Sequence, residues 1–380
     1  MLIDAQHSQA HGVGAGVDAK YDPFVIQNEG MGLMSRFFPG KAKLHKIIRV
    51  VVQYIIPLTA LVYIVFAIRG LPEEGVQRWT ASLEFSSNVF FLLALLLTLT
   101  FFNWFFESVK WKLLADRLQK ISVISSLKGV LYGVTLGMVT PKRMGDFAGR
   151  AMVLNPENRV RGMIVNSAAS LSQIVVTLIP GLVALGMVVL FFAGGGPHGP
   201  AEGDLRMDLV WYTGIAIFLL LLFMFNMRRL SAWLMKFKTR YSWLQVLDVF
   251  ESLSHNQMNR LFLFSTLRYG IFILQFYILL RLFQFPATLF DAFFLLALIY
   301  LVMTVVPLSS LGEAGIRGSV ALFVFEFFYL PSEGFYSGMG LGVLAAVMAV
   351  WFINLVVPGL AGALIAMGGG ISLKPQTRKS

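Results

Sequence analysis

Long apolar runs alternate with short polar or basic stretches over most of the chain. A membrane-spanning helix needs about 20 predominantly apolar residues, and a soluble domain rarely repeats such runs. The pattern therefore predicts about six full membrane spans. These runs lie near residues 50–68, 85–106, 163–192, 209–226, 261–282 and 338–366.

Two further apolar segments are shorter, and each is interrupted by a proline and by glycines. They read TLGMVTPKRMGDFAGRAMVL at 135–154 and TVVPLSSLGEAGIRGSVALFVF at 304–325. Proline and glycine break helices, and broken backbone at membrane depth must be buried in protein or line a wet cavity. The predicted breaks are Pro141, Gly145, Pro307, Gly312 and Gly315.

The charges of the loops predict how the chain crosses the membrane. Lysine and arginine gather before the first run, after the second, around 150–161 and in 228–260, whereas the loops near 69–84, 194–208 and 331–338 hold few. Positive loops stay cytoplasmic. The charges agree with this rule if both broken segments are re-entrant hairpins that enter from opposite faces. The alternative is that each arm of the two hairpins crosses the membrane completely, which would give roughly ten crossings.

The predicted fold is an all-α polytopic membrane protein with an inverted repeat of about six full spans and two re-entrant broken-helix hairpins. Residues 1–40 are polar and glycine-rich, which predicts a disordered cytoplasmic tail. Residues 41–195 hold the first repeat, with its hairpin near 123–157. Residues 205–368 hold the second, with its hairpin near 290–330, and 369–380 form a basic cytoplasmic tail. We expect a multi-pass protein of the plasma (inner) membrane with both termini cytoplasmic.

Composition supports a membrane protein and excludes several other classes. The 380 residues are 57% hydrophobic and have a mean hydropathy of +0.73. The net charge of +11 lies in loops between apolar runs, so it does not indicate nucleic-acid binding. The absence of cysteine excludes disulfides and thiolate metal sites, and the five histidines are scattered. We expect no metal, no cofactor and, since catalytic motifs are missing, no enzyme activity.

Charged residues in the two broken segments are the candidate binding site. A helix N-terminus with arginine nearby binds anions, and arginine matches phosphate geometry. Charges at membrane depth are costly and mark function by default. The candidate cations are Lys142, Arg143 and Arg150 from the first hairpin, Arg317 from the second, and Arg268 from the span between. Asp146 and Glu313 are candidate counter-ions that could also carry a proton.

Each of these candidates also has a purely structural explanation. Lys142 and Arg143 could lie at an ordinary cytoplasmic helix end. Asp146 and Arg150 are four residues apart and could form only a salt bridge, and Arg317 could pair with Glu313 in the same way. Glu107 is expected at the membrane interface. Interhelical hydrogen bonding is expected of the amides in the spans, namely Asn103, Asn166, Gln173, Gln275 and Asn354.

The two broken motifs resemble those of the flippase-like family named for the lysylphosphatidylglycerol synthase transmembrane region. The family pattern N/T-P-x-R-x-G-D/E is matched by Thr140, Pro141, Arg143, Gly145 and Asp146. A later pattern, P-x-S-x-G-x-G-[VI]-R-E, is matched by Pro307, Ser309 or Ser310, Gly315, Ile316 and Arg317. Gly318 stands where the family has the final carboxylate, and Glu313 comes earlier.

The resemblance implies transbilayer translocation of an anionic lipid, either a phospholipid or a polyprenyl-phosphate-linked lipid. It does not imply aminoacylation of lipid, since the soluble domain of the full synthases is missing. The expected partners are membrane lipids and not nucleic acid, and a homo-oligomer stays open. One alternative is a non-catalytic subunit or scaffold of an envelope lipid or glycan assembly system. A third hypothesis is an intramembrane enzyme that acts on a lipid phosphate.

Overall fold

The computed structural model describes only helices, turns and short connecting loops. The residues that it describes are 73, 77, 80, 87–140, 143–193, 203–226, 229–230, 232–233, 236, 250, 253–283, 285–305, 313–329 and 339–368. All of them belong to one compact unit, residues 53–380, and none of them is in a strand. The all-α prediction is confirmed for this part of the chain. The span predicted near 50–68 and both predicted tails lie outside it.

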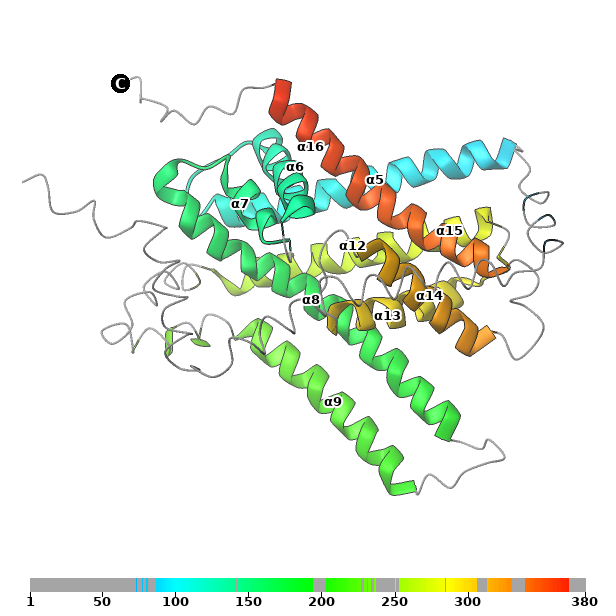
Figure 1. Ribbon diagram of the computed structural model, residues 1–380. Coiled ribbons are helices and arrows are strands. Elements are labelled where there is room, and N and C mark those ends of the chain that lie inside the picture. Colours follow the sequence, from blue (N-terminus) through cyan, green and yellow to red (C-terminus); the bar gives the residue numbers. More distant parts are fainter. Residues whose placement is uncertain are drawn as a thin grey trace, which may run out of the picture. The chain divides into compact units, whose positions relative to one another are not determined.

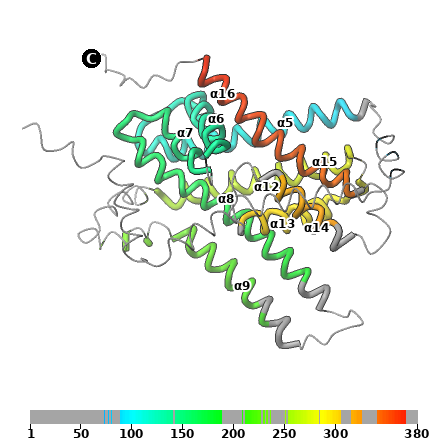
Figure 2. Tube along the Cα trace, in the orientation of Figure 1, coloured from blue at the N-terminus to red at the C-terminus, as the bar shows by residue number. Residues whose placement is uncertain are grey.

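Four helical stretches are long and apolar enough to cross a membrane. They are α5 (Ser87–Ala115), α8 (Pro156–Ala193), α12 (His255–Leu282) and a rod made of α15 (Met339–Trp351), the π-helix η6 (Phe352–Val356) and α16 (Val357–Gly368). Figure 2 shows α15 running on into α16. The chain is therefore a multi-pass membrane protein. α5 is longer than the span predicted for it near 85–106.

Five other helices are described over their full length. They are α6 (Val123–Val139), α7 (Gly145–Ala151), α9 (Gly203–Phe225), α13 (Leu289–Val305) and α14 (Glu313–Tyr329). A helix of 17 residues, such as α6 or α13, is about 25 Å long and so falls short of a hydrocarbon core of about 30 Å. α7, with seven residues, is far too short to span.

Helices α6 and α7 form a hairpin with their backbones in close contact. Glycines recur every fourth residue along α6, at 129, 133 and 137, and α7 carries Gly145 and Gly149. A Cβ atom on Gly149 would lie 2.5 Å from Gly133 N, and one on Gly145 would lie 2.3 Å from Leu136 O. Only glycine permits this approach, and such stripes are typical of helix pairs in membranes.

The hairpin begins and ends beside the same loop, which follows α5. Gln119 Oε1 in that loop accepts hydrogen bonds from Asn155 N at 2.9 Å and Asn158 Nδ2 at 3.2 Å, directly after α7. Asp116 Oδ1 accepts from Ile121 N at 3.1 Å, directly before α6. The chain thus returns across α7 to the end of the molecule from which α6 departs.

Two further helix pairs bring together segments far apart in the sequence. α6 packs on α16, and α13 packs on α8, while α5 and α12 pack on each other between them (Figure 1). In the first pair, a Cβ on Gly362 would lie 2.4 Å from Leu131 O. In the second, a Cβ on Gly181 would lie 3.0 Å from Ala297 O. Both pairs therefore meet through a glycine. Gly181 belongs to the Pro-Gly dipeptide 180–181, and Gly362 follows the Pro-Gly dipeptide 358–359.

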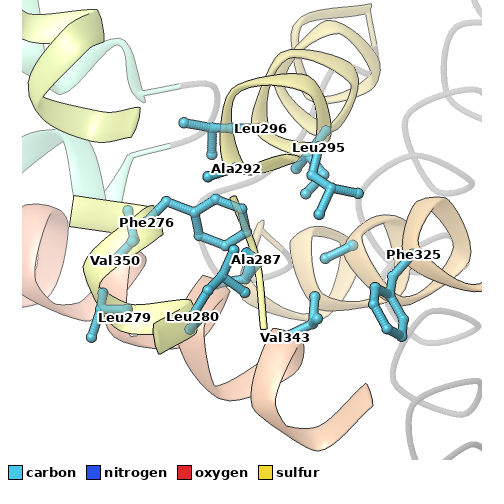
Figure 3. Packing of buried hydrophobic residues seen from close by; sticks show 14 of the residues in the cluster. Phe276, Leu279, Leu280, Ala287, Ala292, Leu295, Leu296, Phe325, Val343 and Val350 are labelled. Atoms are coloured by element: carbon cyan, nitrogen blue, oxygen red, sulfur yellow. The ribbon is translucent and has the colours of Figure 1, made fainter. Parts of the chain in front are cut away.

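The buried apolar residues form two clusters. One lies among α12, α13, α14 and α15 and includes Phe276, Leu295, Phe325 and Val343 (Figure 3). The other is built around Trp111 at the far end of α5 and includes residues of α6, α8 and α12. Leu96 of α5 belongs to the first cluster, so the stretch of α5 between Leu96 and Trp111 connects the two.

Candidate functional site

A stripe of polar residues occupies the part of α5 that lies between the two apolar clusters. Its members, Thr100, Asn103, Glu107 and Lys110, follow one another at intervals of three, four and three residues, which places them on one face of the helix. Asn103 and Lys110 have no exposed surface, and Glu107 retains 5%. Polar side chains buried to this degree in a membrane span need partners, and each of these has them.

Glu107 is the centre of a buried ion cluster. Its Oε1 atom lies 2.6 Å from Arg150 Nη1 of α7. Its Oε2 atom lies 3.3 Å from Lys110 Nζ on its own helix and also pairs with Arg268 Nη1 of α12. One carboxylate thus faces three cations that come from three helices.

Arg150 also binds a second carboxylate, that of Asp146, which thereby joins the cluster. Asp146, one turn earlier in α7, accepts from Arg150 Nε at 3.0 Å and from Arg150 Nη2 at 3.2 Å, in a two-pronged arrangement. The predicted pairing of Asp146 with Arg150 is therefore present. It is one part of a larger network, because the remaining Nη1 atom of Arg150 reaches Glu107.

Arg268 joins the ion cluster to a chain of amides. Its Nε atom donates to Asn103 Oδ1 at 2.8 Å, and Asn103 Nδ2 donates to Asn354 Oδ1 at 2.7 Å. Asn354, in the π-helix, donates to Gln275 Oε1 at 2.8 Å, and Gln275 donates to Thr100 at 2.9 Å. The chain links α5, α12 and the α15–α16 rod, as expected of interhelical amides.

The amides of α8 behave in two different ways. Gln173 Oε1 accepts from Arg268 Nη1 at 3.3 Å and from Lys110 Nζ at 3.4 Å. Helix α8 therefore also contacts the cluster. The amide of Asn166 is fully buried and has no hydrogen-bond partner among the described residues. The prediction of interhelical hydrogen bonding is thus confirmed for Gln173, while the described contacts include none for Asn166.

An aromatic pair connects Arg268 with the second broken segment. The guanidinium of Arg268 lies 5.7 Å from the ring centroid of Phe272, which meets Tyr300 of α13 edge to face at 6.1 Å. The guanidinium of Arg317 in α14 lies 5.3 Å from the ring centroid of Tyr300. Arginine stacks favourably on such rings. The two arginines predicted to share a site thus contact the two ends of one aromatic pair.

The structure describes only some of the residues around the two predicted breaks. Pro141, Lys142, Pro307 and Gly312 lie outside the described residues, and of Glu313 only its place at the start of α14 is described. Gly315 is buried in α14.

The tip of the first hairpin is described from Arg143 onward. Arg143 adopts a positive φ of 56°, and its N–H donates to Thr140 O at 3.2 Å. Thr140 Oγ1 accepts from Gly145 N at 2.7 Å, which starts α7. A positive φ is uncommon outside glycine, so the backbone is strained at Arg143.

Two residues of the cluster were not predicted as site residues. Glu107 was expected at the membrane interface, a prediction about depth, and the structure shows in addition that its buried side chain pairs with three cations. Lys110 was counted among the basic residues of a cytoplasmic loop, yet it has no exposed surface. The signal that finds both is the polar stripe, which continues the face of Thr100 and Asn103 beyond the predicted end of the span.

Asp116, the first residue after α5, stabilises the loop that joins α5 to α6. Asp116 accepts from Lys112 Nζ at 2.8 Å and from Ile121 N at 3.1 Å. Burial alone raises the pKa of Asp116, but these hydrogen bonds outweigh it and leave the pKa below its usual value. Asp116 therefore stays ionised near neutral pH and fixes the start of α6.

The ion cluster, defined as Glu107, Lys110, Asp146, Arg150 and Arg268, has more positive than negative charge. It holds three cations and two carboxylates, so its net charge is +1. Uncompensated charge in a buried site attracts an ion of opposite sign. Among the described residues no group of three histidine or acidic side chains is suited to a metal ion. The arrangement is thus chemically fitted to an anion.

A family model described as "Lysylphosphatidylglycerol synthase TM region" matches residues 47–341. The match covers most of the chain, including every residue of the ion cluster and both broken segments. It confirms the resemblance drawn from the two motifs. No curated protein and no solved structure matches the chain.

Proposed function

The chain belongs to the Lysylphosphatidylglycerol synthase TM region family, and we propose on that basis that it moves an anionic lipid between the two leaflets of a membrane. The lipid is a phospholipid or a polyprenyl-phosphate-linked lipid. Its headgroup phosphate passes the ion cluster while its hydrocarbon chains remain in the bilayer. The membrane in question is the plasma (inner) membrane, with both termini on the cytoplasmic side.

The observation that carries this proposal is the buried net positive charge. Lys110, Arg150 and Arg268 are at most 9% exposed, and they converge from three helices on one carboxylate. A purely structural network has no need of the third cation, because isolating unbalanced charge from water costs several kcal/mol, of the order of 3–5. A site that must hold a phosphate does need it.

The proposed architecture is an inverted repeat with two re-entrant hairpins. It is supported by the reciprocal pairing of helices, in which α6 of the first half packs on α16 and α13 of the second half packs on α8. The shared Pro-Gly dipeptides at 180–181 and 358–359 agree with it. The return of α7 to the loop where α6 begins supports a re-entrant first hairpin. Inverted repeats place their sites where such broken helices meet.

Access to the cluster requires a movement, because its cations are buried. The α6–α7 hairpin is the element best suited to move, since it supplies both Asp146 and Arg150 and ends in a strained turn at Arg143. Such movement would uncover Arg150 toward one leaflet while α5 and α12 keep Lys110 and Arg268 in place.

A leaflet-exposure assay tests the proposal. The purified chain is reconstituted into phosphatidylcholine liposomes with a trace of fluorescent phosphatidylglycerol, and an impermeant quencher reports the labelled lipid that reaches the outer leaflet. We expect the wild-type chain to accelerate exchange. Arg150→Gln and Arg268→Gln should each reduce the rate at least about tenfold, while Arg260→Gln, a matched change on the exposed part of α12, should leave it unchanged.

The result also separates the proposal from its alternatives. Correctly folded protein that accelerates exchange of no anionic lipid, tested with phosphatidylglycerol and with a polyprenyl phosphate, would favour the scaffold function. Release of free phosphate from either lipid would favour an intramembrane enzyme.

A further inference from the structure

We propose, on the basis of the proposed function, that the lipid phosphate shares the three cations of the ion cluster with Glu107 and that the site selects headgroups with one negative charge. The ligand class is a phosphodiester, and phosphomonoester dianions are disfavoured. This inference rests on two observations, the contacts of Glu107 and the net charge of the ion cluster.

The contacts of Glu107 reproduce those that a phosphodiester would make. Its two oxygen atoms divide the cations between them, with Arg150 on Oε1 and with Lys110 and Arg268 on Oε2. A phosphodiester likewise spreads one negative charge over two equivalent oxygen atoms, and arginine binds both groups in the same forked geometry. A phosphodiester that enters beside Glu107 therefore meets donors that already lie around a carboxylate.

The charge of the cluster determines which phosphate it accepts. Three cations and two carboxylates leave +1, so a bound monoanion brings the buried site to neutrality. A dianion would leave −1, and a buried net charge is costly. A dianion is accommodated only if one carboxylate, Glu107 or Asp146, takes a proton from water and becomes a neutral carboxylic acid. Selection thus follows from charge balance in a site closed to solvent.

The groups that face Glu107 from each packed helix agree with this selection. They are Lys110 on α5, Arg150 with its partner Asp146 on α7, Arg268 on α12 and the neutral Gln173 on α8. All three cations already contact Glu107, and Gln173 adds no charge, so a phosphodiester that enters beside Glu107 meets a net charge of +1.

Lipid binding by charge variants tests the inference. The purified chain is equilibrated in phosphatidylcholine nanodiscs with equal amounts of phosphatidylglycerol, a phosphodiester, and phosphatidic acid, a phosphomonoester, and the co-isolated lipids are counted by mass spectrometry. The buffer is held at about pH 7, because a phosphomonoester with a second pKa of about 6 is then mainly a dianion. The wild-type chain should retain phosphatidylglycerol in preference.

Removing the charge of Glu107 should reverse that preference. Glu107→Gln raises the net charge to +2, and we expect the ratio of phosphatidic acid to phosphatidylglycerol to rise at least about tenfold. Glu157→Gln, the same change at an exposed position of α8, should keep the wild-type ratio. Lys110→Gln lowers the net charge to zero and should weaken retention of both lipids. It remains informative if Glu107→Gln does not fold.

The double variant Glu107→Gln/Lys110→Gln restores +1 and should restore the preference for phosphatidylglycerol. A role of Glu107 in folding alone predicts no such return. An unchanged lipid ratio in folded Glu107→Gln, or a wild-type preference for phosphatidic acid, overturns the inference while leaving the proposed function intact. Folded wild-type protein that retains neither lipid and translocates neither overturns both.

Discussion

Replacing Glu107 with glutamine should destabilise the protein more than any other single change in the ion cluster. The substitution keeps the shape of the side chain but removes the charge that three cations share. Lys110 suffers most, because its remaining described partner is Gln173 at 3.4 Å. Breaking a buried ion pair by removing one partner costs about 3–5 kcal/mol, and we expect Glu107→Gln to lie in that range.

Asp146→Asn provides the internal comparison. It removes a carboxylate from the same network, but Arg150 keeps its contact with Glu107 at 2.6 Å, and the Asp146 side chain is 15% exposed rather than enclosed. The expected cost is roughly 1–3 kcal/mol. The exposed Glu157→Gln should change the free energy of unfolding by less than about 0.5 kcal/mol.

The assay is unfolding of the detergent-solubilised protein, followed by tryptophan fluorescence under increasing denaturant. The three variants should rank Glu107→Gln, Asp146→Asn and Glu157→Gln in decreasing order of destabilisation. Adding Lys110→Gln to Glu107→Gln should cost less than the sum of the two single changes, because it removes the cation left without its partner. Equal effects of Glu107→Gln and Asp146→Asn would refute the central place given to Glu107.

Three further changes test the packing around the cluster. Gly149→Ala should lower stability by about 1–3 kcal/mol because its Cβ would lie 2.5 Å from backbone atoms of α6, whereas Gly186→Ala, with nothing within 4 Å, should be neutral in the same unfolding assay. Asn354→Leu removes the amide that joins α5 and α12 to the rod and should cost about 1–3 kcal/mol. Tyr300→Leu removes the ring beneath Arg317 and should cost about 0.5–1.5 kcal/mol, with Tyr300→Phe retaining most of the stability.

Local pattern was sufficient to predict most helices. The first hairpin was predicted near 123–157, and α6 (Val123–Val139) begins there and ends shortly before a proline that no helix continues. The all-helical fold follows from the length of the apolar runs in the same way. The sequence alone also indicates that the glycines of α6 share one helix face, since they are spaced four residues apart.

The span in α5 was predicted to end near residue 106, because the charged residues that follow were taken to lie in a solvent-exposed loop. Lys110 follows an apolar run and resembles the first residue of a basic loop. A lysine within a span needs a polar partner, and here Glu107 lies one turn away. The spacing of Glu107 and Lys110 permitted that pairing but did not require it.

The partners across helices could not be predicted from one sequence. Arg268 contacts Asn103, 165 residues away, and Asn103 contacts Asn354 over a separation of 251. Such contacts depend on which helix faces meet, and several faces carry amides of similar character. Arg268 was nevertheless identified as a candidate, because a charge in a span is costly wherever its partner lies.

One cross-linking measurement tests most directly whether a lipid phosphate enters the ion cluster. The chain contains no cysteine, so a single one can be introduced at Gln173, which contacts Lys110 and Arg268, or at its neighbour Ile174, which is 42% exposed. Each variant is reconstituted with a phospholipid whose headgroup ends in a thiol beyond the phosphate, and disulfide formation is followed under mild oxidation. The account predicts rapid cross-linking at position 173 and little at 174. Cross-linking at 174 that equals or exceeds that at 173 would mean that the headgroup stays outside the protein, and it would contradict the account.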